Sequence, residues 1–408
     1  MPDKLLFIEA NTSGTGMLAL RKSIALGLSP LFFTNNPQRY AGLEEINCPV
    51  LICDTNRLQA LQAAIRENVS QAEIEGIITT SDFYLETVAT LADRCGLPGN
   101  PPEAMKNARN KALTRQILEQ GAIPQPRFAV ARSAADVGDI LKKLGLPCVV
   151  KPTDDSGSNN VVFCQTKEQA EEQVAKILAT HHNVRGQQTA DVALVEEYLE
   201  APELSVEMFT WQGKTTCIGI TQKTLMGFPY FVEVRHLFPA PLPDEQSQQI
   251  THTVQQALTL LGIRYGATHT EVKWTPQGCF LIEINARLAG GMIPELIHLV
   301  TGIDLLEQQI RSVVRRPVSL QGKLQGVAGI QFLCAEKSGI LHSIEGLEKV
   351  ATMRDVVSVA ATAKAGMSVQ PPQNAYDRLG YVMVQSLDAE TATVRLQDAV
   401  NHVRLHIR

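Results

Sequence analysis

The sequence predicts an α/β protein built from several lobes, and three observations lead to this prediction. The chain has 408 residues, which is enough for two to three domains at roughly 150 residues each. Residues 1–100 alternate short apolar strand patterns with helical patterns, which is typical of a parallel sheet covered by helices. The middle of the chain instead holds successive strand patterns, which indicate antiparallel sheets with α+β character.

Residues 1–100 are expected to form the first α/β domain. The strand patterns LLFIEA, PLFFTN, VLIC and GIITT alternate with helical patterns such as MLALRKSIALG. SGTGMLA fits the G-x-G-x-x-A pattern of a dinucleotide-binding turn, but the second strand ends in TNN at residues 34–36, where the ribose would need an acidic residue. We therefore favour a tight turn between strand and helix. The prolines of LPGNPPEAM mark the end of the domain.

Residues 101–188 are expected to form a helical linker and a small lobe. ARNKALTRQILEQG predicts a helix that a glycine closes, and GLPCVVKP predicts a strand that ends on Lys151. The polar loop DDSGSNNV separates this strand from VVFC. We therefore expect an antiparallel hairpin with a mobile loop at residues 154–160.

Residues 189–316 are expected to form a large lobe, and residues 317–408 a C-terminal lobe. ALVEEYLE, ELSVEMFT, KTTCIGITQK, THTEVKWT and CFLIEINA predict antiparallel strands, with the helix DEQSQQITHTVQQALTLLG between two of them. GKT at residues 213–215 is similar to the end of a P-loop. A strand pattern follows it where a P-loop has a helix, so a hairpin turn is the better interpretation.

Composition and charge exclude several classes of function. The net charge is −5 and the pI is about 6.0, which gives no basic surface for nucleic acid. No run reaches the ~18 apolar residues of a membrane span, and the N-terminus lacks a signal-peptide pattern. The eight cysteines form no CxxC pair and do not cluster with the nine histidines. We therefore expect reduced thiols, no zinc site and a cytoplasmic protein.

The stretch EINARLAGG places three polar groups at the end of an apolar strand pattern. Glu283, Asn285 and Arg287 alternate, so they are expected on one face of the strand. Glu271 lies on the preceding strand of the same predicted hairpin. Two carboxylates and an amide oxygen form a ligand set that suits Mg²⁺ held together with phosphates, with Mn²⁺ as the alternative ion. The other interpretation is a surface hairpin with solvated charges.

Other segments contain groups that could bind the same ligand. Lys151 ends a buried strand, and the backbone N–H groups of Ser156, Gly157 and Ser158 could cradle phosphate oxygens. The alternative for Lys151 is a lysine whose charged end extends to solvent. LVEEYLE is expected to offer a strand edge with free backbone groups for adenine, and Glu203 could accept hydrogen bonds from ribose hydroxyls.

Taken in order, these segments resemble a known family. RNKALTR, CVVKP, the Gly/Ser loop, VEEYLEAPELSVE, HTEVKW and LIEINARLAGG, in that order over nearly the whole chain, resemble the ATP-grasp superfamily of carboxylate–amine ligases. SVEMF, TQK, FVEVRHLFPAP and NARLAGG are most similar to the L-amino acid ligases that make dipeptides, as in bacilysin synthesis. The resemblance implies an ATP-grasp architecture, with an N-terminal parallel α/β lobe, a two-part ATP-binding region and a C-terminal lobe.

The resemblance also implies roles for individual residues, with Lys151 and Arg287 as the catalytic pair. It departs from the family pattern at Ala286, where a proline often follows the asparagine. The implied contacts are Lys111 and Lys151 to the ATP phosphates, Glu196, Glu197 and Leu199 to adenine, Glu203 to the ribose, and Glu271, Glu283 and Asn285 to Mg²⁺.

The function implied is that of an ATP- and Mg²⁺-dependent ligase. Phosphoryl transfer would activate a small carboxylate as an acyl phosphate, an amine would attack it, and ADP and phosphate would be released. The partners are thus a small carboxylate and a small amine, without nucleic acid or membrane, and a homodimer is compatible with this function. An ATP-grasp carboxylase or purine-pathway enzyme is the alternative, and a non-catalytic nucleotide-binding protein is a third interpretation.

FPYFVEVRHLFPAP gathers aromatic residues in a chain with 5% aromatics. One interpretation is a substrate pocket, in which His236, or Arg235 in a shifted register, faces the reacting carboxylate. Strand neighbours alternate, so the other residue would point away. Arg287 would approach from the opposite side, at the turn before Gly290 and Gly291. The alternative is a core strand with a hydrogen-bonded histidine.

Overall fold

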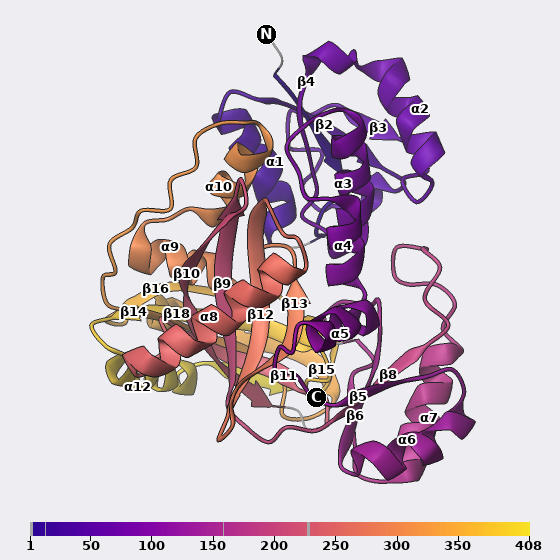
Figure 1. Cartoon of the computed structure of the whole chain (residues 1–408). Helices are drawn as coiled ribbons and strands as arrows, with labels where there is room; N and C mark the ends of the chain where they lie inside the picture. The colour runs from indigo at the N-terminus through magenta and orange to yellow at the C-terminus, as the bar shows by residue number, and fades with distance from the viewer. Residues whose placement is uncertain (1–2, 13, 158, 227–228) are drawn as a thin grey trace.

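The N-terminal part of the chain is a parallel α/β layer, as predicted. The computed structural model describes residues 3–12, 14–157, 159–226 and 229–408 (Figure 1). A Cβ atom on Gly16, in the first turn of α1, would lie 1.9 Å from the Asn11 carbonyl oxygen, so the predicted tight connection from strand to helix leaves room only for glycine at this position. The sheet has the order β3-β2-β1-β4 and is built from β1 (Lys4–Ile8), β2 (Ser29–Thr34), β3 (Val50–Ile52) and β4 (Ile74–Ile78), with helices α1 (Thr15–Ala25), α2 (Leu58–Asn68) and α3 (Leu85–Arg94).

A small four-stranded sheet follows, with helices α6 and α7 packed against it (lower right in Figure 1). The helical linker is broken at Asn110, whose side chain caps the second of its two helices. The linker helices are α4 (Pro102–Arg109) and α5 (Lys111–Gln120). The small sheet has the order β5-β8-β6-β7 and consists of β5 (Phe128–Ala131), β6 (Cys148–Pro152), β7 (Val162–Cys164) and β8 (Ala193–Glu197), with α6 (Val137–Leu144) and α7 (Lys167–Leu178).

The predicted hairpin of β6 and β7 is confirmed, but the predicted strand edge at LVEEYLE is wrong. β8 pairs with β6 on one side and with β5 on the other, so its backbone groups are used within the sheet. β5 is distant in sequence, and this long-range pairing leaves no local signal. β8 also belongs to the small sheet, although the expected boundary put it in the large lobe. The four-part division of the chain stays a prediction.

The rest of the chain forms one large antiparallel sheet, to which strands of the expected C-terminal lobe are added. Its order is β13-β12-β9-β10-β11-β14-β18-β16. Helix α8 packs on β9, β10 and β13, and α12 packs on β14 and β18 (Figure 1). The strands are β9 (Glu203–Trp211), β10 (Lys214–Met226), β11 (Val232–Phe238), β12 (Gly266–Thr275), β13 (Gly278–Asn285), β14 (Val327–Cys334), β16 (Val356–Ala361) and β18 (Arg378–Ser386).

Helices and a second, small sheet complete this part of the molecule. The GKT segment at residues 213–215 lies at the start of β10, after a hairpin turn from β9, as predicted. The helices are α8 (Asp244–Leu260), α9 (Ile293–Thr301), α10 (Leu305–Val313), α11 (Leu347–Ala351) and α12 (Ala389–Asn401), and the small sheet joins β15 (Gly339–Glu345) to β17 (Ser368–Val369) and β19 (Arg404–Ile407).

Alternation along residues 203–207 of β9 and 269–273 of β12 gives this part of the large sheet one apolar and one polar face. Leu204, Val206 and Val272 are buried in a core with residues of α8. The alternate positions Ser205 and Glu271 pair across the two strands and face the other way. This second face is turned toward the small sheet and carries the charged groups described below. No helix within the described ranges is long and apolar enough to cross a membrane, and all eight cysteines are free thiols.

Candidate active site

A cleft of about 830 Å³ lies between the small and large sheets and collects most of the predicted site residues. A smaller cavity of about 260 Å³ adjoins it, since both are lined by Lys111, Asp155 and Glu283. The large cleft is also lined by the predicted residues Lys151, Ser156, Gly157, Glu196, Glu197, Leu199, Glu203 and Glu271, and the small cavity by Asn285.

The predicted metal ligands come together at the β12–β13 hairpin. Glu271 and Glu283 are directly opposite partners in the ladder, and Asn285 is two residues beyond Glu283 on the same face. A bulge between Glu271 and Val272 shifts the pairing by one residue and so brings Glu271 opposite Glu283. Glu283 lies 3.4 Å from the Lys111 ammonium. Glu283 lines the large cleft together with Glu271 and the smaller cavity together with Asn285, and the role of the three residues as Mg²⁺ ligands stays a prediction.

Lys223 is a residue of this face that sequence reasoning did not assign to the site. Its ammonium lies 2.7 Å from Glu271 and 3.2 Å from Glu203, and it also pairs with Glu233. Burial alone would lower the pKa of Lys223, but the three carboxylates outweigh it and hold that pKa well above the ordinary value. The polar alternation of ELSVE and HTEVK gives the face, but a bulge between Cys217 and Gly219 in β10 is needed to place Lys223 on it.

Lys151 belongs to a buried ionic chain and does not extend to solvent. Its ammonium lies 2.7 Å from one oxygen of Glu196, whose other oxygen accepts from the Arg115 guanidinium at 2.6 Å. Burial would raise the pKa of Glu196, but Arg115 and Lys151 lower it to about 2. The Glu196 side chain therefore orients Lys151. Glu196 is also paired with β5 and β6 through its backbone, and its adenine contact stays a prediction.

Lys111 is placed beside the same cleft by the break in the linker. It is the first residue of α5, and its ammonium donates to the Asp155 carbonyl oxygen at 2.8 Å. Gly157 follows in the loop of residues 154–160, named the phosphate loop for its predicted ligand. Its φ is +75°, a conformation that glycine adopts without strain. Ser158 lies outside the described residues.

The predicted adenine end of the cleft is lined by aromatic and charged side chains. Glu197 is tied to Arg127 at 2.6 Å, and the Leu199 carbonyl oxygen accepts from the Lys273 ammonium at 2.8 Å. The same ammonium lies 4.9 Å from the centre of the Tyr198 ring. Tyr198 in turn stacks with Phe231, with ring centres 6.1 Å apart. These flat surfaces suit a base, and Glu203 lies in the same lining.

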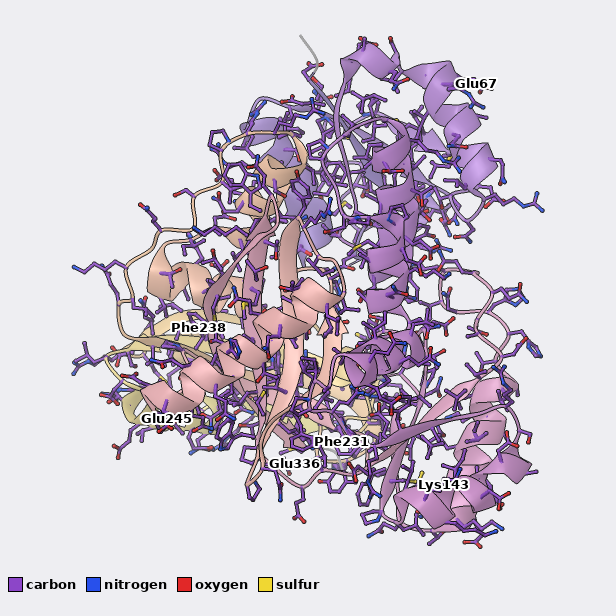
Figure 2. All side chains as sticks on the ribbon, viewed as in Figure 1. Glu67, Lys143, Phe231, Phe238, Glu245 and Glu336 are labelled. Carbon is purple, nitrogen blue, oxygen red and sulfur yellow. The ribbon has the colours of Figure 1, made fainter. Side chains whose placement is uncertain are left out.

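The predicted aromatic substrate slot is wrong as a single pocket. Figure 2 shows Phe231 where the large sheet faces the small lobe, and Phe238 within the large sheet away from it. Phe231 lines the large cleft, whereas Phe238 is fully buried in the core. Phe231 precedes β11 and Phe238 ends it, so the two rings lie at opposite ends of this strand although they are close in sequence. Phe228 lies outside the described residues.

His236 is buried, and Arg235 points to the opposite side, as strand alternation predicts. The Arg235 guanidinium donates to Gln331 at 2.6 Å. A Cβ atom on Gly291 would lie 2.5 Å from His236 Nε2, so the imidazole packs directly against this glycine. Burial lowers the pKa of His236 to about 3, although Glu233 lies 3.5 Å from Nε2. Among the described residues, neither ring nitrogen has a hydrogen-bond partner, so the alternative of a hydrogen-bonded core histidine is not met.

Arg287 lies two residues beyond the end of β13, so strand alternation does not place its side chain. It nevertheless lies near the carboxylates of the site, since burial would lower its pKa but Asp82 first, and then Glu283 and Glu271, raise that pKa. The strand ends at Asn285, and the chain turns there toward Gly290 and Gly291. The Arg287 Nε atom donates to Asp82 Oδ2 at 2.6 Å. Asp82 comes from the N-terminal layer and was not predicted. The space around Gly290 is open, with no atom within 4 Å of an added Cβ.

Comparisons with known proteins give the family context. Residues 144–295 match the ATP-grasp domain family, and residues 331–408 match the L-amino acid ligase C-terminal domain 2 family. An uncharacterized protein of Sinorhizobium fredii, y4rH, is 29% identical over 400 residues, covering 98% of this chain and 82% of that protein. Alanine–anticapsin ligase of Bacillus subtilis is 27% identical over 252 residues, covering 57% of this chain; the match spans about half (52%) of the ligase.

A solved structure shares the fold along the whole chain. The crystal structure of L-amino acid ligase from Bacillus licheniformis superposes with a TM-score of 0.84 at 23% identity, covering 100% of both chains. At this identity the likeness shows the fold. The chain therefore contains an ATP-grasp domain over residues 144–295 and an L-amino acid ligase C-terminal domain over residues 331–408.

Proposed function

We propose that the protein is an ATP- and Mg²⁺-dependent ligase that joins two small amino-acid-like substrates through an amide or peptide bond. The single observation that carries this proposal is the placement of Glu271 and Glu283 as opposite partners on a cleft face that Lys111 and Lys151 also border. Two carboxylate oxygens and two ammonium groups in one cleft match the opposite charges of a divalent ion and a polyphosphate.

The residues present fit both cofactors. Glu271, Glu283 and Asn285 supply only oxygen ligands, which is the set that Mg²⁺ prefers, and Mn²⁺ would accept the same set. Tyr198, Phe231 and the Leu199 backbone suit a purine, and Glu203 suits ribose hydroxyls. When bound, ATP supplies the phosphoryl group that turns a substrate carboxylate into an acyl phosphate.

The chain's own residues position the substrates and balance charge in this reaction. Lys111 and Lys151 would bind phosphate oxygens, and Arg287 would stabilise the charge that develops on the transferring phosphoryl group. His236 is neutral above about pH 4, given its lowered pKa of about 3, so it would act as a hydrogen-bond donor or acceptor toward the substrate carboxylate. It would form the substrate pocket with Arg287, Gly290 and Gly291.

Two further findings support the ligase proposal. The relative from Bacillus subtilis is named for ligating alanine and anticapsin, and the C-terminal match is to L-amino acid ligases.

All eight thiols are free, which favours a reducing compartment, so we place the protein in the cytoplasm. The carboxylase alternative lacks such support, because no observation in the described residues favours bicarbonate.

A product screen tests this function. The protein is incubated with ATP, Mg²⁺ and the amino acids, singly and in pairs, and nucleotide and dipeptide products are quantified by chromatography. We expect ADP, phosphate and a dipeptide in equal amounts for at least one pair. AMP and pyrophosphate as the products would exclude this class, and turnover of bicarbonate or a ribosylamine without any amino acid would favour the alternative.

A further inference from the structure

Asp82 connects the N-terminal layer to the candidate active site. It begins the short helix Asp82–Tyr84, which follows β4. β2 and β4 lie on opposite sides of β1, so the strand order reverses here, and parallel sheets place functional residues at such points. Asp82 is 6% exposed and lines the smaller cavity with Glu283 and Asn285.

One oxygen of this carboxylate holds two groups from different lobes. Asp82 Oδ2 accepts from Arg287 Nε at 2.6 Å and from Ser156 Oγ at 2.7 Å. Burial would raise the pKa of Asp82, but Arg287 and Arg109 outweigh it and lower that pKa to about 2. The carboxylate is therefore charged at any pH near neutrality, and both bonds are charge-assisted.

Ser156 lies in the loop of residues 154–160, which is the phosphate loop. The linker helices hold the base of this loop. Arg109 donates to the Asp154 carbonyl oxygen at 2.6 Å, and Lys111 donates to that of Asp155 at 2.8 Å. These two bonds fix the base of the loop to the linker helices. The hydrogen bond from Ser156 to Asp82 links the loop to Arg287, because Arg287 donates to the same carboxylate oxygen.

We propose that Asp82 is a positioning residue that couples closure of the phosphate loop to the orientation of Arg287. The proposal rests on the proposed function, because it assigns Arg287 to the transferring phosphoryl group. Among the described residues, Arg287 uses Nε for Asp82 and Nη1 for the Leu288 carbonyl oxygen. Three of its five N–H donors are thus left for phosphoryl oxygens. Because Ser156 donates to the same Oδ2 atom, movement of the loop would change how this carboxylate holds the guanidinium.

The test compares Asp82→Asn with the wild type and with the matched control Glu45→Gln. Glu45 pairs with Arg21 at 3.0 Å on the surface of the same lobe, so this control removes an ion pair far from the cleft. ADP and dipeptide are measured in the same reactions, over a range of ATP concentrations. We expect Asp82→Asn to lower kcat about tenfold or more, because the misoriented arginine loses its transition-state contact, while the KM for ATP stays within about threefold.

A second readout separates positioning from a structural role. If loop closure is uncoupled, the acyl phosphate meets water, so Asp82→Asn should release more ADP than dipeptide, whereas wild type and Glu45→Gln release equal amounts. Wild-type kcat with equal products would overturn the proposal, as would a raised KM for ATP with normal kcat. Failure of the wild type to make any dipeptide would instead count against the proposed function.

A third variant keeps the proposal testable if Asp82→Asn does not fold. Asp82→Glu keeps the charge opposite Arg287 but moves the carboxylate by one methylene. With a melting temperature like that of the wild type, it should show reduced kcat and excess ADP to a smaller degree than Asp82→Asn. A folded Asp82→Glu variant with wild-type kcat and equal products would refute the positioning role.

Discussion

Lys151 and Lys223 are both buried lysines at the same cleft, but the charges around them differ in sign. Lys151 shares one carboxylate, Glu196, with Arg115, so two cations meet one anion. Lys223 meets three carboxylates, from Glu203, Glu233 and Glu271. The first cluster has positive charge to spare and suits phosphates, and the second has negative charge to spare and suits a cation. The cleft is thus divided electrostatically before any ligand binds.

Neighbouring groups moderate the second cluster without reversing its sign. Arg378 lies 3.3 Å from Glu233, and His269 lies 3.6 Å from Glu271. Burial would lower the pKa of His269, but Glu207 outweighs it and raises that pKa to about 9. The pKa of Glu203 is nevertheless raised, first by burial and then by the neighbouring carboxylates, although Lys223 opposes the shift.

The largest effect is expected from Glu283→Ala, which removes a carboxylate of the predicted metal site. Turnover should fall about a hundredfold or more even at saturating Mg²⁺, because the metal stabilises charge in the transition state. Steady-state ADP release measures this. The control is Glu345→Ala, which removes an exposed carboxylate of β15 that pairs with His406. Near-normal turnover of Glu283→Ala would contradict the assignment of Glu283 to the metal site.

Local patterns predicted much of this side of the cleft. Alternation in EIN and HTEVK predicted the strands and their polar residues, but the short turn alone would pair Glu271 with Ile282. The bulge that follows Glu271 is what brings this residue opposite Glu283. Lys223 escaped prediction because a bulge in β10 sets its face, and Asp82 because the N-terminal layer approaches the site only through long-range packing. The same reason explains the error at β8, where a distant strand covers the expected edge.

The next largest effect is on stability, from Lys223→Met. Three partly buried carboxylates would lose the buried cation that they share, and breaking a buried ionic group typically costs about 3–5 kcal/mol. Urea unfolding at pH 7 measures the loss. Wild-type unfolding at the same pH is the reference, and Lys323→Met on an exposed segment is the control. A loss under about 1 kcal/mol would mean that the three carboxylates do not need this cation.

The pH dependence of the same variant sharpens the comparison. In the wild type, burial raises the pKa of Glu233, but Lys223 is the strongest of the groups that lower it to about 2. The contribution of ionised Glu233 to stability is therefore present above the pKa that this carboxyl has in the unfolded chain, and it is lost as pH falls toward 2. Without Lys223 the carboxylate pKa values should rise. The deficit of the variant relative to wild type should then shrink between pH 7 and pH 5, and a constant deficit would contradict this.

A smaller effect is expected from His236→Ala. The imidazole packs on Gly291 beside the proposed substrate pocket, so KM or kcat for the amino-acid substrate should change about tenfold, equivalent to ~1.4 kcal/mol. The KM for ATP should stay near normal. Arg235→Ala is the matched control, because the neighbouring side chain points to Gln331 on the other side. Unchanged kinetics for every substrate would show that His236 has only a structural role.

The smallest effect is expected from Glu203→Ala. Its carboxylate lines the proposed ribose end of the cleft, where contacts change little between ground and transition states. The KM for ATP should rise a few-fold, equivalent to ~1 kcal/mol, which is in the range of the net contribution of one hydrogen bond, with kcat near normal. Kinetics at varied ATP concentration measure this. A large fall in kcat at unchanged KM would instead indicate that Glu203 acts in the reaction step together with Glu271.

The most direct test of the central claim follows an oxygen atom from substrate to phosphate. The amino-acid mixture is supplied with ¹⁸O in its carboxylate groups, together with ATP and Mg²⁺, and the phosphate is analysed by mass spectrometry. If the carboxylate attacks the terminal phosphorus of ATP and the amine then displaces phosphate, each phosphate released with dipeptide carries one ¹⁸O atom from the substrate. Unlabelled phosphate, or label recovered in AMP, would contradict the acyl-phosphate ligase account.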